Sequence, residues 1–414
     1  MKDKEFFRYN RKKLIVCVIL TILVFLYGLL VTYNIVRISK YKNTVLPNSY
    51  VQEYAIGDYS YESLGEFLTF LNGLVNDKKL TFVVNGKEVS YKYSEIGLYL
   101  NTEKIIKEIE LYQKDLGYTN KLKLLHDKNK KVYDYIFTYN SENLDLFLNR
   151  LKSDVDTARV DGHFVDDGTK VYYLKGVNAF SLDIDNARDI IVKTITDGIK
   201  DDTKIELTGS IEEAVNNDSY ATVDTMVSTF TTEFNQYIYA RAQNLYTALN
   251  YINGVVIEPG EEFSYYKYAG PFNKAGYVFY YEFVGNGVCQ IATTTYNAAL
   301  LGGLEITKRY PHAAKSLYVA GGLDATVASY SSGWYVDMAF KNTYEYPIYI
   351  KAYAHDGKAT VEFWSNSNAK GGYEYTTESV QIGYRGYESY LNVWKDGEFV
   401  EKRFIARTWY IKDN

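Results

Sequence analysis

A single cysteine is the residue best suited to covalent chemistry in this chain. Of the two cysteines among 414 residues, Cys17 lies in a long apolar stretch, and Cys289 lies in the segment 285–290, Gly-Asn-Gly-Val-Cys-Gln. The apolar run after it predicts a helix that begins at Cys289 or Gln290 and ends before the glycines at 302 and 303. Unpaired N–H groups and the helix dipole at a helix N-terminus stabilise a thiolate. Cys289 is therefore a candidate nucleophile, and the alternative is a buried, inert thiol.

The residues around Cys289 could support such a nucleophile. The glycines at 285 and 287 permit a tight backbone turn that presents the sulfur. A neighbouring backbone N–H could then donate a hydrogen bond to an oxyanion. We expect substrate and oxyanion to contact the residues that flank the thiol, namely Gly287, Val288, Gln290 and Thr293.

A thiol nucleophile needs a base, and two histidines follow Cys289 in the chain, His312 and His355. His355 is expected at a hairpin tip, so His312 is the expected partner, unless it is an ordinary loop histidine. Either Asp324 or Asp337 could accept a hydrogen bond from His312 Nδ1, and Asp324 is slightly favoured.

Arg309, three residues before His312, could bind a substrate carboxylate through two parallel hydrogen bonds, or could face solvent. One cysteine and one histidine fall short of a zinc ligand set. We therefore expect no metal and no cofactor.

An apolar, uncharged run near the N-terminus sets the expected compartment. Residues 14–36 are long enough to cross a bilayer as a helix. Residues 1–13 carry most of the flanking positive charge, which predicts a cytoplasmic tail and an exported remainder that begins with a tether over 37–59. A cleaved signal peptide is the alternative, but the run is long for one and has no small-residue cleavage site.

The net charge of the N-terminal part differs in sign from that of the expected exported part. Residues 1–42 hold nine Lys/Arg and two Asp/Glu, a net charge of +7, and the rest hold 37 Lys/Arg and 49 Asp/Glu, a net of −12. The acidic part has no basic patch of the kind that nucleic acid requires, so nucleic acid is not an expected partner.

The exported part is expected to contain an α+β repeat region over 60–225. Its first unit has a hairpin over 80–91 and a helix over 102–114, and its second has strand-turn-strand over 170–182 and a helix from 184 to about 198. A further helix is expected over 143–155. The region is interpreted as a spacer or a binding module.

Residues 226–365 predict an α+β domain with the nucleophile at a helix N-terminus, packed on a mostly antiparallel sheet. A helix is expected over 229–252, and an irregular aromatic segment over 263–281. Residues 366–414 are expected to form further antiparallel strand with a turn at 395–397. The expected strands between them lie at 306–309, 316–319, 326–329, 335–340, 348–353 and 360–363.

The order of several motifs resembles that of the VanW-domain family over about residues 225–365. Residues 60–220 are similar, more loosely, to the peptidoglycan-binding repeats that often precede this domain. Asn286, Ala292 and Thr295 depart from the common Gly, Ser and Leu, which bears on substrate detail. The matching motifs are residues 241–245 (RAQNL), 256–264 (VIEPGEEFS), 287–290 (GVCQ), 293–294 (TT), 296–300 (YNAAL), 303–306 (GLEI), Arg309, His312, 324–326 (DAT) and Asp337 through 340–342 (FKN).

Members of this architecture in clostridia are understood to be peptidoglycan L,D-transpeptidases that use the domain's cysteine. The resemblance implies that Cys289 is the nucleophile and His312 its base, acting on stem peptides and glycan. Together with the anchor predicted over residues 14–36, the resemblance implies a single-pass membrane protein that faces the wall of a Gram-positive-type bacterium. A cysteine peptidase on wall peptides would use the same pair with water as acceptor, and a non-enzymatic peptidoglycan-binding scaffold is the third alternative.

Overall fold

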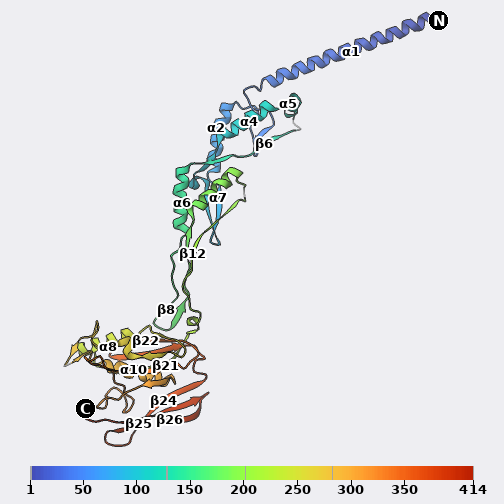
Figure 1. Ribbon diagram of the computed structural model, residues 1–414. Helices are drawn as coiled ribbons and strands as arrows, with labels where there is room; N and C mark the ends of the chain where they lie inside the picture. Colours follow the sequence, from blue (N-terminus) through green and yellow to red (C-terminus); the bar gives the residue numbers. More distant parts are fainter. Residues whose placement is uncertain (1, 127–128, 201, 282, 414) are drawn as a thin grey trace. The chain divides into compact units, whose positions relative to one another are not determined.

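The computed structural model describes residues 2–126, 129–200, 202–281 and 283–413 (Figure 1). The chain divides into two compact units. One contains residues 1–158 and 179–212, and the other contains residues 159–178 and 213–414.

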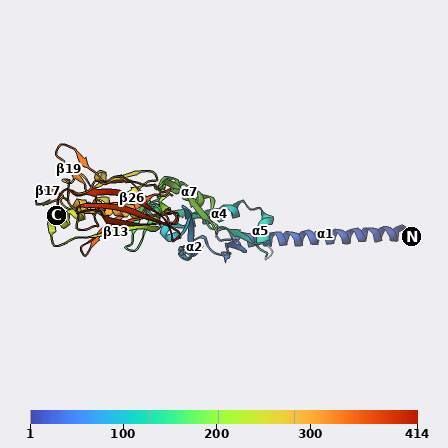
Figure 2. The ribbon, with the colours of Figure 1, turned by 90° about the horizontal axis from the view of Figure 1, so that it is seen from below.

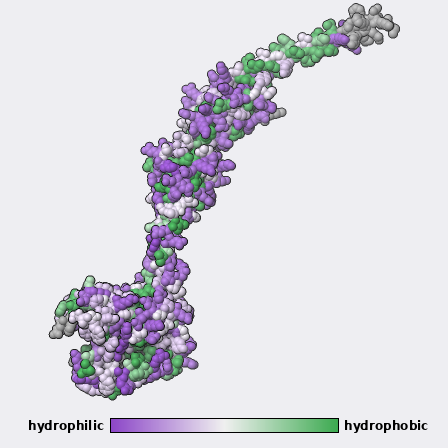
Figure 3. Space-filling view, viewed as in Figure 1, coloured by the Kyte–Doolittle hydropathy of each residue, from purple (hydrophilic) through white to green (hydrophobic). Residues whose placement is uncertain are grey.

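The N-terminal helix α1 (Lys2–Ser39) is continuous in both ribbon views (Figures 1 and 2). Its stretch from residue 11 to residue 39 is long and apolar enough to cross a membrane, a property that a signal sequence shares. All residues from 11 to 30 are exposed, and the space-filling view shows an apolar surface along much of the helix (Figure 3). The described part of the protein therefore does not cover these side chains, which favour an apolar environment outside it.

The first unit is a mixed α+β structure of small sheets and amphipathic helices. Its sheets have the strand orders β2-β1-β6, β11-β3-β4, β5-β7 and β10-β12. Four of its helices begin at a residue whose side chain accepts a backbone N–H of the first turn: Ser60, Asn101, Asn140 and Asp183. The predicted hairpin and the helices expected at 102–114, 143–155 and 184–198 are confirmed, with small shifts at their ends. The elements are β1 (Ser49–Val51), β2 (Tyr54–Ala55), α2 (Tyr61–Val75), β3 (Lys79–Val84), β4 (Lys87–Lys92), α3 (Tyr93–Ile96), β5 (Leu98–Leu100), α4 (Thr102–Asp115), α5 (Tyr118–Leu124), β6 (Lys131–Tyr133), β7 (Phe137–Tyr139), α6 (Ser141–Val155), β10 (Ala179–Leu182), α7 (Ile184–Asp197), β11 (Lys204–Leu207) and β12 (Gly209–Glu212).

The strand-turn-strand predicted over 170–182 is wrong as a hairpin. The strand β9 (Val171–Leu174) pairs with β8 (His163–Asp166), whereas β10 pairs with β12. Asp167 makes the turn between β8 and β9, because its Oδ1 accepts the N–H groups of Thr169 and Lys170. Residues 159–178 consequently belong to the second unit, so the two predicted repeats are not two separate units of structure.

The second unit is built around the antiparallel sheet β13-β23-β22-β14, and the helices α8 and α10 pack on it. The unit also contains three-stranded sheets with the orders β15-β21-β18 and β24-β25-β26, and the two-stranded sheets β8-β9, β16-β17 and β19-β20. The strands β24, β25 and β26 are labelled in Figure 1. Its remaining elements are η1 (Tyr220–Thr222), β13 (Thr225–Glu233), α8 (Tyr239–Ile252), β14 (Val256–Ile257), β15 (Glu262–Ser264), α9 (Tyr265–Ala269), β16 (Phe279–Tyr280), β17 (Phe283–Val284), α10 (Val288–Leu301), β18 (Glu305–Lys308), β19 (Ala328–Ser329), β20 (Tyr335–Val336), β21 (Ala339–Lys341), β22 (Ile348–His355), β23 (Lys358–Ser365), β24 (Tyr373–Gln381), β25 (Gly386–Lys395) and β26 (Glu398–Trp409).

Two predicted elements of this unit are wrong. The helix expected over 229–252 begins only at Tyr239, because residues 225–233 form β13 and pair with β23. Four threonines within residues 225–233 favour a strand through their branched side chains. Residues 316–319, expected as a strand, form a loop beside His312. The tail strands with their turn at 395–397 are confirmed as β24, β25 and β26.

Candidate active site

The backbone before Cys289 is fixed by two glycines in left-handed conformations. Gly287 is the N-cap of α10 and has φ +113°, and Gly285 has φ +74°. A Cβ on Gly285 would lie 2.5 Å from the Phe272 carbonyl oxygen, and one on Gly287 would lie 2.7 Å from Leu245 Cδ1. Only glycine fits both positions. The helix α10 begins at Val288, one residue earlier than predicted, and Cys289 is its second residue.

A buried asparagine on α8 holds this glycine turn. Asn244 is fully buried, and its Nδ2 donates to the carbonyl oxygens of Val278 and Asn286 at 3.1 and 3.0 Å. Its Oδ1 accepts the Val278 N–H at 2.8 Å. Because the buried side-chain amide of Asn244 forms hydrogen bonds with backbone groups, it acts as a positioning group. No role was predicted for Asn244, although an asparagine among the apolar residues of α8 is a visible signal.

Cys289 is a free, partly exposed thiol whose Sγ faces the segment after Asp324. Sγ lies 3.4 Å from Thr326 Oγ1, 3.2 Å from the Val327 carbonyl oxygen and 3.4 Å from the Val327 nitrogen. Burial raises the pKa of the Cys289 thiol, but a hydrogen bond to His312 and the charge of that imidazolium outweigh it, so the pKa falls below its usual value. The lowered pKa favours the thiolate form of Cys289.

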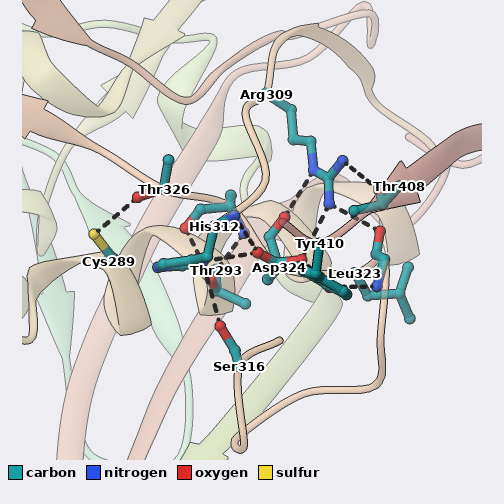
Figure 4. A network of polar contacts seen from close by, with 12 residues as sticks. Cys289, Thr293, Arg309, His312, Ser316, Leu323, Asp324, Thr326, Thr408 and Tyr410 are labelled. Carbon is teal, nitrogen blue, oxygen red and sulfur yellow. Dashed lines mark hydrogen bonds and ion pairs between the residues drawn. The ribbon is translucent and has the colours of Figure 1, made fainter. Parts of the chain in front are cut away.

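His312 lies between Cys289 and Asp324 (Figure 4). Its Nδ1 is 2.7 Å from Asp324 Oδ2, and its backbone N–H donates to the same oxygen at 2.7 Å. The hydrogen bond to Cys289 therefore falls to Nε2. Burial lowers the pKa of His312, but Asp324 and Cys289 together raise it to about 9. The lowered pKa of the thiol and the raised pKa of the imidazole both favour a thiolate–imidazolium pair.

The loop that replaces the strand expected over 316–319 also contacts this histidine. Ser316 Oγ lies 3.3 Å from His312 Nδ1, and the Tyr318 ring meets the imidazole edge-on at 6.5 Å between centroids. Leu317 between them is 88% exposed. The alternation of exposed and facing side chains resembles a strand pattern, but the segment has no strand partner among the described residues.

Asp324 is buried and accepts hydrogen bonds at both oxygens, and it is the centre of the polar network in Figure 4. Besides His312, it accepts from Tyr410 OH at 2.7 Å and from Arg309 Nη2 at 3.2 Å, both at Oδ1. Burial raises the pKa of its carboxyl, but these donors outweigh burial and hold the pKa below its usual value. Asp324 is therefore the charged group that orients His312.

Asp337, the alternative third residue, has a different task. Its Oδ2 accepts from Ser264 Oγ at 2.6 Å and its Oδ1 accepts the Tyr266 N–H at 2.8 Å. These bonds fix the first turn of α9. The structure thus brings Asp324, and not Asp337, to His312.

The guanidinium of Arg309 forms its hydrogen bonds with groups of the protein. It donates to the carbonyl oxygens of Asp324 and Gly322, to the Asp324 carboxylate and to Thr408 Oγ1. Its side chain is 10% exposed. The expectation that Arg309 binds a substrate carboxylate is therefore corrected, because its donors hold the Asp324 loop in place.

Gln290 and Thr293 are buried, and both make internal hydrogen bonds. Gln290 accepts from Arg241 Nη2 at 2.6 Å, and Thr293 exchanges two hydrogen bonds with the Ala325 backbone. Val288 is also buried. The described contacts of these side chains are internal and position α10 against its neighbours. Among the residues that the structure covers, no group of three or more His, Cys, Asp or Glu is placed to hold a metal ion.

Tyr410, the residue after β26, contacts the site, and this contact was not predicted. Its hydroxyl donates to Asp324 and accepts the Gly322 N–H at 2.8 Å. We expect Tyr410→Phe to destabilise the second unit by about 2 kcal/mol, because a buried carboxylate and a buried N–H both lose a partner. Urea unfolding followed by tryptophan fluorescence measures this, since all four tryptophans lie in residues 334–409.

The matched control is Tyr390→Phe on β25, whose hydroxyl bonds Glu388 at 2.5 Å away from the Asp324 network. It is expected to leave the unfolding midpoint unchanged. Equal destabilisation by both variants would contradict the role given to Tyr410.

Two family models and one curated relative match parts of this chain. Residues 240–364 match the family described as "VanW like protein", and residues 89–204 match the "Putative peptidoglycan binding domain". The chain is 32% identical over 146 residues to the uncharacterized protein YoaR of Bacillus subtilis (strain 168). That alignment covers 33% of this chain and 47% of YoaR, so the chain matches about half of that relative's length. No solved structure matches the chain.

Proposed function

The chain carries a VanW-like domain preceded by a peptidoglycan-binding domain, and we propose that it is an L,D-transpeptidase that forms 3→3 cross-links between peptidoglycan stem peptides. The observation that carries the proposal is the series Cys289–His312–Asp324, in which a carboxylate orients an imidazolium against a thiolate. In this proposal α1 is a membrane anchor with a cytoplasmic N-terminus, and the remainder faces the cell wall. Catalysis belongs to residues 226–365 together with 366–414, because Thr408 and Tyr410 complete the Asp324 network.

The first half-reaction transfers an acyl group to sulfur. The Cys289 thiolate attacks the carbonyl carbon of the third stem residue, and the C–N bond to the terminal D-Ala breaks. The Cys289 N–H supports the oxyanion, since it has no acceptor among the residues that are described and lies in the first turn of α10. His312 gives its Nε2 proton to the departing D-Ala amine, which leaves a thioester and a neutral imidazole.

The second half-reaction forms the cross-link. The side-chain amine of another stem attacks the thioester carbonyl and gives its proton to His312 Nε2. The C–S bond breaks and the thiolate returns beside the imidazolium. One peptide bond replaces another, with D-Ala released, so no further energy source is required.

The rate of this reaction is expected to follow a bell-shaped pH profile. The acid limb reflects protonation of the Cys289 thiolate, at a pH below the usual thiol value because its pKa is lowered. The alkaline limb is expected near pH 9, where His312 loses the proton that D-Ala departure needs. Initial rates of dimer formation between pH 5 and about 10.5 measure both limbs. A rate that still rises above pH 10 would contradict the role of the imidazolium as acid.

A direct test uses the full chain in detergent, incubated with a disaccharide-tetrapeptide and analysed by mass spectrometry. A dimer that has lost one D-Ala, formed by wild type and absent with Cys289→Ala, is the expected result. Tripeptide without dimer would establish a cysteine carboxypeptidase, which uses the same pair with water as acceptor. Untouched substrate with both proteins would favour a non-enzymatic scaffold.

A further inference from the structure

A second arginine lies beside the thiol, and its donors are almost unused. Arg241, in the first turn of α8, is half-buried and donates through Nη2 to Gln290 Oε1 at 2.6 Å. Gln290 is the only acceptor found for it within residues 2–126, 129–200, 202–281 and 283–413. A guanidinium has five N–H groups, so four remain for a ligand.

The protein fixes this guanidinium next to Cys289. The Gln290 amide that accepts from Arg241 is itself held, because its Nε2 donates to Thr232 Oγ1 at 3.0 Å and to the Glu233 carbonyl oxygen at 2.9 Å. The Arg241 stem lies against the N-cap of α10, since a Cβ on Gly287 would come within 3.1 Å of Arg241 Cγ. The cation and the Cys289 sulfur are close enough to interact electrostatically.

The charge of Arg241 has no carboxylate partner among the described residues. Arg309, by contrast, is paired with Asp324 and bonds two carbonyls and a hydroxyl. A half-buried cation has lost part of its hydration, and hydrogen bonds to an anionic ligand would compensate for that loss. The Arg241 guanidinium therefore favours the binding of a planar anion, such as a carboxylate, near the nucleophile.

We propose that Arg241 binds the free carboxylate of the donor stem and so selects donors that end one residue after the scissile bond. The inference rests on the proposed function and assigns its substrate terminus. Consecutive Cα atoms lie 3.8 Å apart, so the terminal D-Ala carboxylate falls within a few ångströms of the carbonyl that Cys289 attacks. A donor extended by another residue, or one with a terminal amide, offers no carboxylate at that point.

The experiment compares two thiol reagents, iodoacetate and iodoacetamide. Iodoacetate has a carboxylate where iodoacetamide has a neutral amide, so the pair tests anion binding by Arg241 without requiring any cross-linking. Modification of Cys289 is followed by mass spectrometry of its peptide in the full chain, for wild type and Arg241→Gln. The ratio of the iodoacetate rate to the iodoacetamide rate is expected to fall about tenfold in the variant, as loss of a charge-assisted hydrogen bond predicts. The ratio cancels any change in thiolate fraction.

Arg403→Gln is the matched control, because it removes an equal charge whose guanidinium pairs with Glu401 on β26. It should leave the ratio at the wild-type value. A parallel assay with tetrapeptide donors that end in D-Ala or in D-Ala amide should show discrimination by wild type and none by Arg241→Gln. An unchanged ratio in Arg241→Gln with cross-linking intact overturns the role of Arg241 alone. A Cys289 that reacts with neither reagent, with no Cys289-dependent product, overturns the proposed function as well.

Discussion

Replacing Cys289 with serine is expected to lower the rate of cross-link formation by at least about 10³-fold, although the two side chains are nearly the same size. A serine hydroxyl stays protonated in the working pH range unless a base accepts its proton. The hydrogen bond to Asp324, which raises the pKa of His312, remains in this variant, so the imidazole still favours its protonated form. The site therefore stabilises a nucleophile that ionises by itself and does not activate one that needs a neutral base.

The control for this variant is Cys17→Ser, the same chemical change on α1, which should retain full activity. Dimer formation from disaccharide-tetrapeptide measures both variants. Substantial activity in Cys289→Ser would show that His312 acts as a neutral general base, and the thiolate–imidazolium description would have to be given up.

Asp324→Asn is expected to lower the cross-linking rate by about 10³- to 10⁴-fold and to move the alkaline limb of the pH profile towards lower pH. Both carboxylate oxygens accept from donors, His312 at one and Tyr410 with Arg309 at the other. An amide has one oxygen, so its NH2 must face one of these donor sets. Without the carboxylate charge, the pKa of His312 falls from about 9 towards its usual value, and the proton needed by the leaving amine is lost earlier.

Asp337→Asn separates this effect from general damage to a buried carboxylate. It disturbs the bonds to Ser264 and Tyr266 at the start of α9, and it should lower stability without moving either limb. Cross-linking rates measured across the pH range for both variants show which aspartate sets the pKa of His312. A shifted alkaline limb in Asp337→Asn, with none in Asp324→Asn, would mean that the third residue had been assigned wrongly.

The local part of the site could be predicted from the sequence because its signals are local. The glycines at 285 and 287, followed by an apolar run, specify the turn and the start of α10, and therefore the place of Cys289. The pairing of His312 with Asp324 spans 12 residues, close enough for loop chemistry to suggest it. Periodicity failed where side-chain type decided the outcome, as in β13, where threonines and pairing with β23 prevailed over a helical pattern.

The different roles of the two arginines, Arg241 and Arg309, could not be predicted from the sequence. Arg241 and Arg309 are chemically identical, and their tasks depend on which groups tertiary structure places near them. Arg309 meets Thr408, 99 residues further along the chain, and Asp324 meets Tyr410, 86 residues further along. No pattern within a window of the sequence contains such pairs.

The long reach from Asp324 to Tyr410 has a consequence for turnover of the protein. A protease that cuts an exposed turn of the last sheet, such as the one at residues 395–397, leaves Cys289, His312 and every residue of the segment 240–364 intact. Release of the strand that follows would nevertheless remove one donor from Asp324 and one acceptor from Arg309. On the proposed function, such a cut would lower activity without altering the thiol. The amount of intact chain on a gel, and not the presence of the cysteine, would then be expected to follow activity.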